Sequence, residues 1–158
     1  MAPSQLTPSL VAVATGIVGS VWTSGAIASL TLIGIPAALA TPQSPGIVWN
    51  GLFTRGMAVM PKVAITTALC YLYGAYEARG ERATRTHLAA AAGLVMSIIP
   101  FTLVFMRNTN EMLLKGASET VTSTATRELI SKWGNLNLAR SLLPLAAGIL
   151  GLYGLRES

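Results

Sequence analysis

Arg140 and Asn137 are the residues of this sequence whose types and spacing most clearly suggest chemistry. Three residues apart on a helix, they share one face and lie about one turn from each other. The uncharged apolar segment that begins at Ser141 follows them directly. Both side chains would therefore lie within, or at the mouth of, a membrane-spanning helix. Ionisable and amide groups at that depth are costly, so they indicate a functional site by default.

The expected companions of this pair are amides, aromatic rings and further guanidinium groups. If four helices run up and down, one membrane face collects the end of the first helix, the start of the second, the end of the third and the start of the fourth. The residues at that face are Trp49, Asn50, Phe53, Arg55, Arg107, Asn108, Asn110, Trp133, Asn135, Asn137 and Arg140. Arginine supplies cation–π contacts and fixed donors, and asparagine supplies a donor and an acceptor. The set suits a flat, oxygen-rich aromatic ligand.

A structural explanation competes with this functional one. The Trp residues could form an interfacial belt, and the Asn residues could cap helices. For Trp49 and Asn50 that explanation is at least as good, whereas for Asn137 and Arg140 we favour a functional role.

Several other chemistries do not fit the sequence. The single histidine, His87, lies at the start of the third apolar segment, roughly 30 Å of helix away from Arg107. With one Cys, no Asp and scattered Glu, no metal-ligand or haem spacing is present. A Ser-His-Asp triad is excluded, and glycine-rich phosphate or dinucleotide motifs are absent. If the protein is an enzyme, we expect it to work with no bound cofactor and no metal.

The elements that would position these side chains are membrane-spanning helices. Hydrophobic residues make up 52% of the chain and charged residues 11%, whereas soluble domains contain about 25% charged residues. A spanning helix needs about 20 apolar residues. Four segments qualify, namely residues 9–40, 56–76, 86–106 and 135–155. The sequence predicts an all-α integral membrane protein, a four-helix up-down bundle that forms a single domain over residues 1–158.

The connections and the packing faces add detail to this prediction. Pro61 is expected to kink the second helix near its start. Residues 108–132 are expected to form a long polar connection that contains a short surface helix at 126–132. Small residues recur every four positions in the first segment, at Ala12, Gly16, Ser20, Ser24 and Ala28. Such faces let helices approach closely, either within one chain or in a homo-oligomer.

The net charge of +5 fits the lipid bilayer as a partner better than nucleic acid. No basic patch interleaved with aromatic residues is present, and the cations are spread among the loops.

Two motifs of the second half resemble the fungal anthrone oxygenases, which are small four-span proteins of aromatic polyketide pathways. The first is IPFTL at 99–103 followed by MRNTNEML at 106–113. The second is Trp133 followed by Asn137, Arg140 and the run SLLPL at 141–145. In the first half, Trp22 with Ser24-Gly25 and Pro36, and the run Phe53-Thr54-Arg55-Gly56 before Pro61, are also similar to the family.

The resemblance implies oxidation of an anthrone to an anthraquinone by O₂, with no flavin, haem or metal, in an internal membrane such as the endoplasmic reticulum. The family's Thr-Asn step falls on Thr109 and Asn110. Its Trp, Asn and Arg pattern falls on Trp133, Asn137 and Arg140. Glu111 stands where a basic residue is expected, and its role stays open.

These correspondences assign roles to the side chains. Catalysis is assigned to Arg140, Asn137 and Asn110, which would hold the negative oxygen of a deprotonated anthrone by preorganised donors. The substrate-binding residues are Trp133, Asn108, Trp22, Phe53, Arg55 and Phe101. No residue is assigned to a metal. The base is left open between Glu111, a tyrosine and water.

Two other functions are alternatives. A membrane protein of the same fold could bind or scaffold a hydrophobic aromatic metabolite without turnover. A small transporter or channel subunit is disfavoured, because the charges gather at one face and do not line a continuous path.

Overall fold

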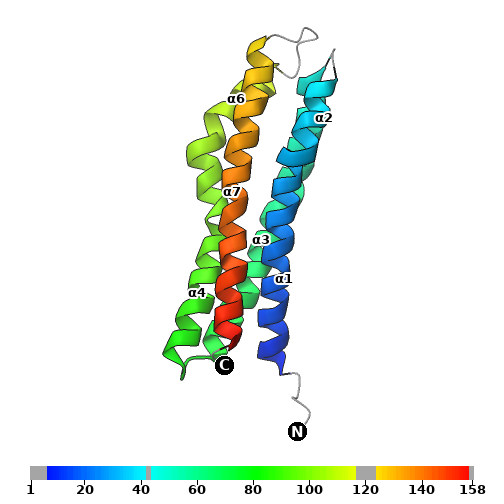
Figure 1. Ribbon diagram of the computed structural model, residues 1–158. Helices are drawn as coiled ribbons and strands as arrows, with labels where there is room; N and C mark the ends of the chain where they lie inside the picture. Colours follow the sequence, from blue (N-terminus) through cyan, green and yellow to red (C-terminus); the bar gives the residue numbers. More distant parts are fainter. Residues whose placement is uncertain (1–6, 42–43, 117–123, 157–158) are drawn as a thin grey trace.

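The computed structural model describes residues 7–41, 44–116 and 124–156. Within these ranges the chain forms four long helical rods and no strand (Figure 1). The first rod consists of α1 (Pro8–Ser29), the π-helix η1 (Leu30–Gly34) and α2 (Ile35–Ala40); the second is α3 (Pro45–Glu77). The third consists of α4 (Arg82–Met96), α5 (Ile98–Phe101), the π-helix η2 (Thr102–Met106) and α6 (Arg107–Gly116); the fourth is α7 (Thr124–Arg156).

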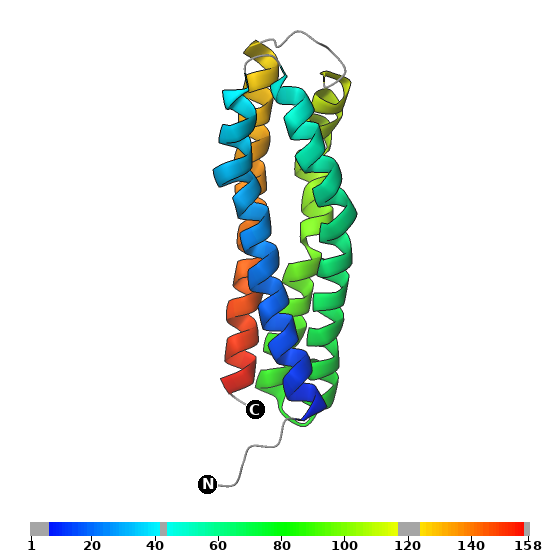
Figure 2. The same cartoon turned by 90° about the vertical axis from the view of Figure 1, so that its right-hand side faces the viewer.

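The four rods run alternately up and down, so α1 begins and α7 ends at the same end of the bundle (Figures 1 and 2). The first rod packs against α3 and α7, and α4 packs against the same two helices from the other side. All four are long and apolar enough to cross a membrane. The prediction of an all-α membrane protein built as a four-helix bundle is confirmed.

The rods are longer than the apolar segments of the sequence. Each has 33 to 35 residues, which at about 1.5 Å per residue makes roughly 50 Å, whereas the hydrocarbon layer is about 30 Å thick. The second rod begins at Pro45 and the fourth at Thr124. The bundle therefore continues beyond the hydrocarbon at the end where these two helices begin.

The prediction of a long polar connection over residues 108–132 is wrong. Helix α6 continues to Gly116, and the short surface helix expected at 126–132 is the beginning of α7. The physical reason is a second apolar core at this end of the bundle, which buries Leu113 and Ile130 beside Trp49 and Trp133. Burial of these side chains stabilises helix in a stretch whose overall composition is polar.

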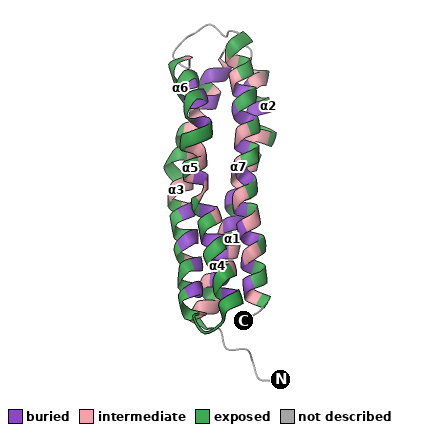
Figure 3. Ribbon diagram, turned by 90° about the vertical axis from the view of Figure 1, so that its left-hand side faces the viewer, coloured by how far each residue is buried: buried purple, intermediate pink, exposed green. Residues whose placement is uncertain are grey.

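The core at the opposite end is built around Tyr71 of α3. Its hydroxyl accepts a hydrogen bond from Ser20 Oγ at 3.1 Å and donates one to the Ala147 carbonyl at 3.2 Å. Gly16 and Gly151 leave room for the ring between α1 and α7. Part of the small-residue face of the first segment is thus used within the chain. As Figure 3 shows, buried residues line the interior of the bundle and exposed ones cover its outer faces.

We expect Gly151→Ala to destabilise the bundle by about 1–3 kcal/mol, the usual cost of overpacking. A Cβ at this position would lie 2.6 Å from Tyr71 Oη and 2.8 Å from Ile17 Cγ1. Gly93→Ala is the matched control, because a Cβ there has no neighbour within 4 Å. Thermal unfolding in detergent should show a lower midpoint for the first variant only. Equal midpoints would contradict the close packing at Tyr71.

Two irregular turns interrupt the otherwise regular rods at similar depth. The π-helix η1 contains Thr31, and η2 contains Thr102. Such turns are frequent at functional sites, because they rotate the side chains that follow them. Pro61 lies in the middle of α3 rather than near its start, and it faces the same region of the bundle interior.

Candidate active site

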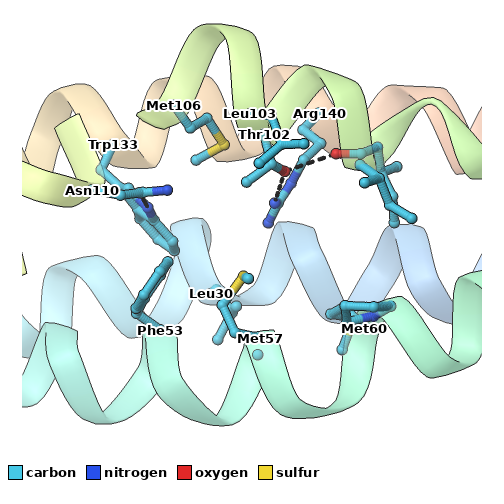
Figure 4. Close-up of a pocket in the computed structure, with 14 residues that line it drawn as sticks. Leu30, Phe53, Met57, Met60, Thr102, Leu103, Met106, Asn110, Trp133 and Arg140 are labelled. Carbon is cyan, nitrogen blue, oxygen red and sulfur yellow. Dashed lines mark hydrogen bonds between the residues drawn. The ribbon is translucent and has the colours of Figure 1, made fainter. Parts of the chain in front are cut away.

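A cavity of about 90 Å³ lies between α3 and the third rod, near the level of the two π-helices (Figure 4). Leu30, Trp133 and Arg140 of the first and fourth rods complete its wall. The remaining lining residues come from α3 and from the third rod: Phe53, Gly56, Met57, Met60, Pro61, Ile98, Ile99, Thr102, Leu103, Met106 and Asn110. Most of these side chains are apolar, so the cavity offers few hydrogen-bonding groups to the polar atoms of a ligand.

Arg140 is the ionisable side chain of this lining, and its guanidinium is directed into the cavity (Figure 4). Nη1 donates to Thr102 Oγ1 at 2.6 Å, and Nη2 donates to Asn137 Oδ1 at 2.6 Å. Nε is buried and has no hydrogen-bond partner among the described residues. An unpaired donor on a buried cation is costly. A guanidinium has five N–H donors and two of them are used here, so donors on Nη1 and Nη2 also remain for a ligand oxygen in the cavity.

Asn137 lies behind Arg140 and does not line the cavity. Its side chain is fully buried, and Nδ2 donates to the Ile27 carbonyl at 2.8 Å and to Thr31 Oγ1 at 3.2 Å. Because both donors of the amide are used in this way, its oxygen remains to accept from Arg140. Asn137 thus anchors the guanidinium to α1 and η1, and its N–H groups are not available to a substrate.

Asn110 and Trp133 form one end of the cavity. The indole Nε1 of Trp133 donates to Asn110 Oδ1 at 2.9 Å. Since this bond fixes the orientation of the amide, its nitrogen points into the cavity (Figure 4). Behind them, Trp49 packs edge-on against Trp133, with 5.9 Å between ring centroids, and stacks on Phe53 at 5.0 Å. The result is an aromatic wall with one donor facing inward.

Four of the predicted substrate-binding residues do not line the cavity. Asn108 and Arg55 are exposed on the outside of the bundle. Trp22 is 51% exposed and lies on the outer surface beside Lys62. Phe101 packs against the second core and lies 4.9 Å from Phe105 between ring centroids. The structure brings together Arg140, Asn110, Trp133 and Phe53 from the predicted set, with Asn137 in support.

Glu111, one of the bases left open, lies outside the cavity. Its carboxylate is half exposed and accepts a hydrogen bond from Arg107 Nε at 2.8 Å. The fully buried Tyr71 belongs to the other core. None of the fourteen lining residues is an Asp, Glu, His, Cys or Tyr.

Sequence reasoning assigned no role to Thr102 and none to the three methionines of the lining. Thr102 accepts the hydrogen bond from Arg140 and donates its own proton to the Ile98 carbonyl at 2.7 Å. The position of Thr102 within the IPFTL motif at 99–103 was the sequence feature that could have indicated a role. Met57, Met60 and Met106 carried no signal, because a methionine in an apolar segment looks like ordinary core.

Similar sequences identify the family of this chain. The sequence model described as "Anthrone oxygenase" matches residues 49–150, a range that includes most of the cavity lining. The chain belongs to the anthrone oxygenase family. It is 37% identical to the anthrone oxygenase encC of Aspergillus fumigatus, over 87% of this chain and 88% of that protein.

Two further relatives carry similar names. The anthrone oxygenase AgnL2 of Paecilomyces divaricatus is 33% identical over 89% of this chain and 93% of its own length. The noranthrone monooxygenase of Aspergillus flavus is 31% identical over 83% of this chain and 67% of its own length. No solved structure matches the chain. The family and these relatives identify the protein as a monooxygenase and support a role as a polyketide anthrone oxygenase, so the non-enzymatic alternative is set aside.

Proposed function

We propose that this anthrone oxygenase converts a polyketide anthrone to the corresponding anthraquinone with O₂ as co-substrate and without a bound cofactor. In this proposal Arg140 stabilises the deprotonated substrate. The observation that carries the proposal is the guanidinium of Arg140, which is directed into a mostly apolar cavity (Figure 4) and has N–H donors beyond the two that Thr102 and Asn137 accept.

The electron balance of the reaction supports independence from a cofactor. Oxidising the central CH₂ of an anthrone to a carbonyl releases four electrons, and reducing O₂ to one inserted oxygen and one water consumes four. No external reductant is needed. Ground-state O₂ is a triplet, so its direct combination with a singlet substrate is spin-forbidden. An electron-rich anthrolate avoids this barrier because it can transfer a single electron to O₂.

The sequence of steps begins with loss of a proton from the CH₂, which leaves a carbanion conjugated to the carbonyl. One electron passes to O₂, and the anthrone radical and superoxide combine into a C–O bond at the same carbon. Protonation gives a hydroperoxide. Removal of the second C–H proton expels hydroxide from the O–O bond and leaves the quinone carbonyl. One oxygen atom is retained, and the other becomes water.

Arg140 and Asn110 act on the first of these steps. Negative charge in the anthrolate resides largely on the carbonyl oxygen, and donors placed for that charge in an apolar site lower the barrier to its formation. The guanidinium supplies the charge and a free N–H donor, and the Asn110 amide nitrogen supplies a second, neutral donor. Trp133 and Phe53 provide flat surfaces for the aromatic rings.

We propose water as the proton acceptor. Arg140 is the ionisable group among the lining residues, and Glu111 is paired with Arg107 outside the cavity. When an oxyanion is strongly stabilised, the CH₂ becomes acidic enough that a weak base suffices. We also propose that the protein resides in an internal membrane, the endoplasmic reticulum, and cell fractionation tests this location.

Oxygen uptake by the purified protein in detergent is the direct test. With emodin anthrone we expect turnover faster than the spontaneous oxidation, and one atom of ¹⁸O from ¹⁸O₂ in the quinone. Dialysis against EDTA and against a copper(I) chelator should leave the rate unchanged. The second chelator is included because Met57, Met60 and Met106 offer thioethers, which are soft copper ligands.

Two results would contradict the proposal in different ways. A rate equal to the spontaneous one would show that the protein does not catalyse oxidation of this class of substrate. Loss of turnover on chelation, restored by a metal, would remove cofactor independence while leaving the reaction in place.

A further inference from the structure

We infer that the anthrone reaches the cavity sideways from the lipid, through an opening between α3 and η2 that Met57 and Leu103 border. The inference rests on the proposed function, because it supplies the route to that cavity. It also narrows the substrate class to neutral aromatic compounds that dissolve in a membrane.

The exposure of the lining residues locates the opening. Among the fourteen, Met57 is 47% exposed and Leu103 is 63% exposed, while all the others are buried or half-buried. The two residues lie on the rods that face each other across the cavity (Figure 4). Helix α3 packs against α4 and α6, and the cavity separates it from the intervening α5 and η2. The cavity therefore reaches the outer surface between these two rods.

Both ends of the cavity are closed by packed side chains. Toward the end where α3 and α7 begin, the hydrogen-bonded Asn110 and Trp133 are buried, and Trp49 covers them. Toward the other end, Ile98 belongs to the core around Tyr71. A path along the bundle axis from either aqueous side would have to displace one of the two cores.

The surface around the opening is suited to lipid. Leu103 lies in the uncharged stretch 88–106, and its neighbours Val104 and Phe105 are exposed on the outside of the same π-helix. Arg107 and Arg55 are each within four residues of the opening along their helices. The opening thus lies where hydrocarbon meets the headgroup layer, the depth at which amphipathic aromatic rings accumulate.

This route determines which part of the substrate enters the cavity first. The carbonyl oxygen leads and meets Arg140, while the two aryl rings that flank the carbonyl pass between apolar side chains. A carboxylate or sugar on either ring would lose its hydration there without gaining a partner. Two features of the walls favour passage of a rigid ring, since Gly56 adds no side chain and methionines rearrange easily.

A removable plug at Leu103 tests the route. In a Cys70→Ala background, Leu103→Cys is modified with an aromatic methanethiosulfonate, and Val104→Cys is the control because it is 72% exposed and does not line the cavity. We expect kcat/KM for emodin anthrone to fall about tenfold or more at position 103 and to change less than about twofold at 104. Reductive removal of the adduct should restore the rate.

A single-turnover experiment separates a blocked route from a damaged site. The Leu103→Cys variant is loaded with anthrone without oxygen, modified at the introduced thiol, freed of excess substrate and exposed to O₂. We expect one equivalent of quinone at the unmodified rate, followed by suppressed steady-state turnover when fresh anthrone is added.

The outcomes distinguish the two proposals. If the adduct at 103 leaves kcat/KM equal to that of the 104 control, or if it abolishes the first turnover as well, the lateral route is wrong and the proposed function stands. If the unmodified protein shows no turnover above the spontaneous rate, the proposed function fails and the route fails with it.

Discussion

Replacing Arg140 with methionine should lower kcat for anthrone oxidation by about 10²- to 10³-fold, the effect of removing a preorganised oxyanion donor. The variant keeps a long apolar stem in the cavity but loses the charge and the free N–H donors of the guanidinium. Oxygen uptake at saturating emodin anthrone measures the loss.

The matched control is Arg107→Met, the same chemical change on an exposed side chain whose partner is Glu111. Because this ion pair is exposed and neither residue lines the cavity, we expect turnover of Arg107→Met to stay near that of the parent protein. The kcat of Arg140→Lys should lie between those of Arg140→Met and Arg107→Met. A lysine ammonium cannot hold Thr102 and Asn137 in a fixed fork while presenting a further donor to the substrate.

Thermal unfolding distinguishes lost chemistry from lost structure. Removing the half-buried cation relieves its desolvation cost, but the buried Asn137 Oδ1 loses its partner, at a cost of about 1–3 kcal/mol. We therefore expect Arg140→Met to remain folded, with a midpoint somewhat below the parent's. A kcat within about threefold of the parent, a difference of less than about 1 kcal/mol, would remove Arg140 from the mechanism.

Asn137→Leu should reduce kcat by about 10- to 100-fold, or roughly 1.4–2.8 kcal/mol in the barrier, although Asn137 does not line the cavity. Its oxygen holds Nη2 of Arg140, and its nitrogen is tied to the Ile27 carbonyl and Thr31. Leucine removes all three bonds, so the guanidinium loses its fixed position. Because this change alters the placement of a transition-state donor, we expect the loss in kcat rather than in KM.

Asn135→Leu is the control for this variant, since Asn135 is exposed two residues earlier on α7. Asn137→Asp adds a change of charge. A carboxylate can still accept from Arg140, but it neutralises the guanidinium and cannot donate to the Ile27 carbonyl, so we expect low turnover. Parent-like turnover in Asn137→Asp would show that the net positive charge is not what the reaction uses.

Both results bear on the network that connects three rods at one depth. Thr31 of η1, Asn137 and Arg140 of α7, and Thr102 of η2 are linked by hydrogen bonds across the bundle interior. Such bonds between membrane helices contribute about 0.6 kcal/mol each on average. We therefore assign to the network the task of directing one guanidinium rather than of holding the bundle together.

The membrane class, the four helices and the pairing of Arg140 with Asn137 were all predictable from the sequence. Apolar length and charge are properties of a local stretch, and a spacing of three residues places two side chains on one helix face whatever surrounds them. The absence of aspartate and the single histidine excluded most other chemistries in the same way.

The membership of the cavity was decided by the tertiary structure. In a membrane helix the side facing lipid is as apolar as the side facing the bundle, so hydrophobicity does not tell which side turns inward. Trp22 therefore looked as suitable as Trp133, yet the packing of Gly16 and Ser20 on Tyr71 turns Trp22 toward the outside. Thr102 meets Arg140 across 38 residues of sequence, a contact set by the rotation of two helices against each other, which no local pattern encodes.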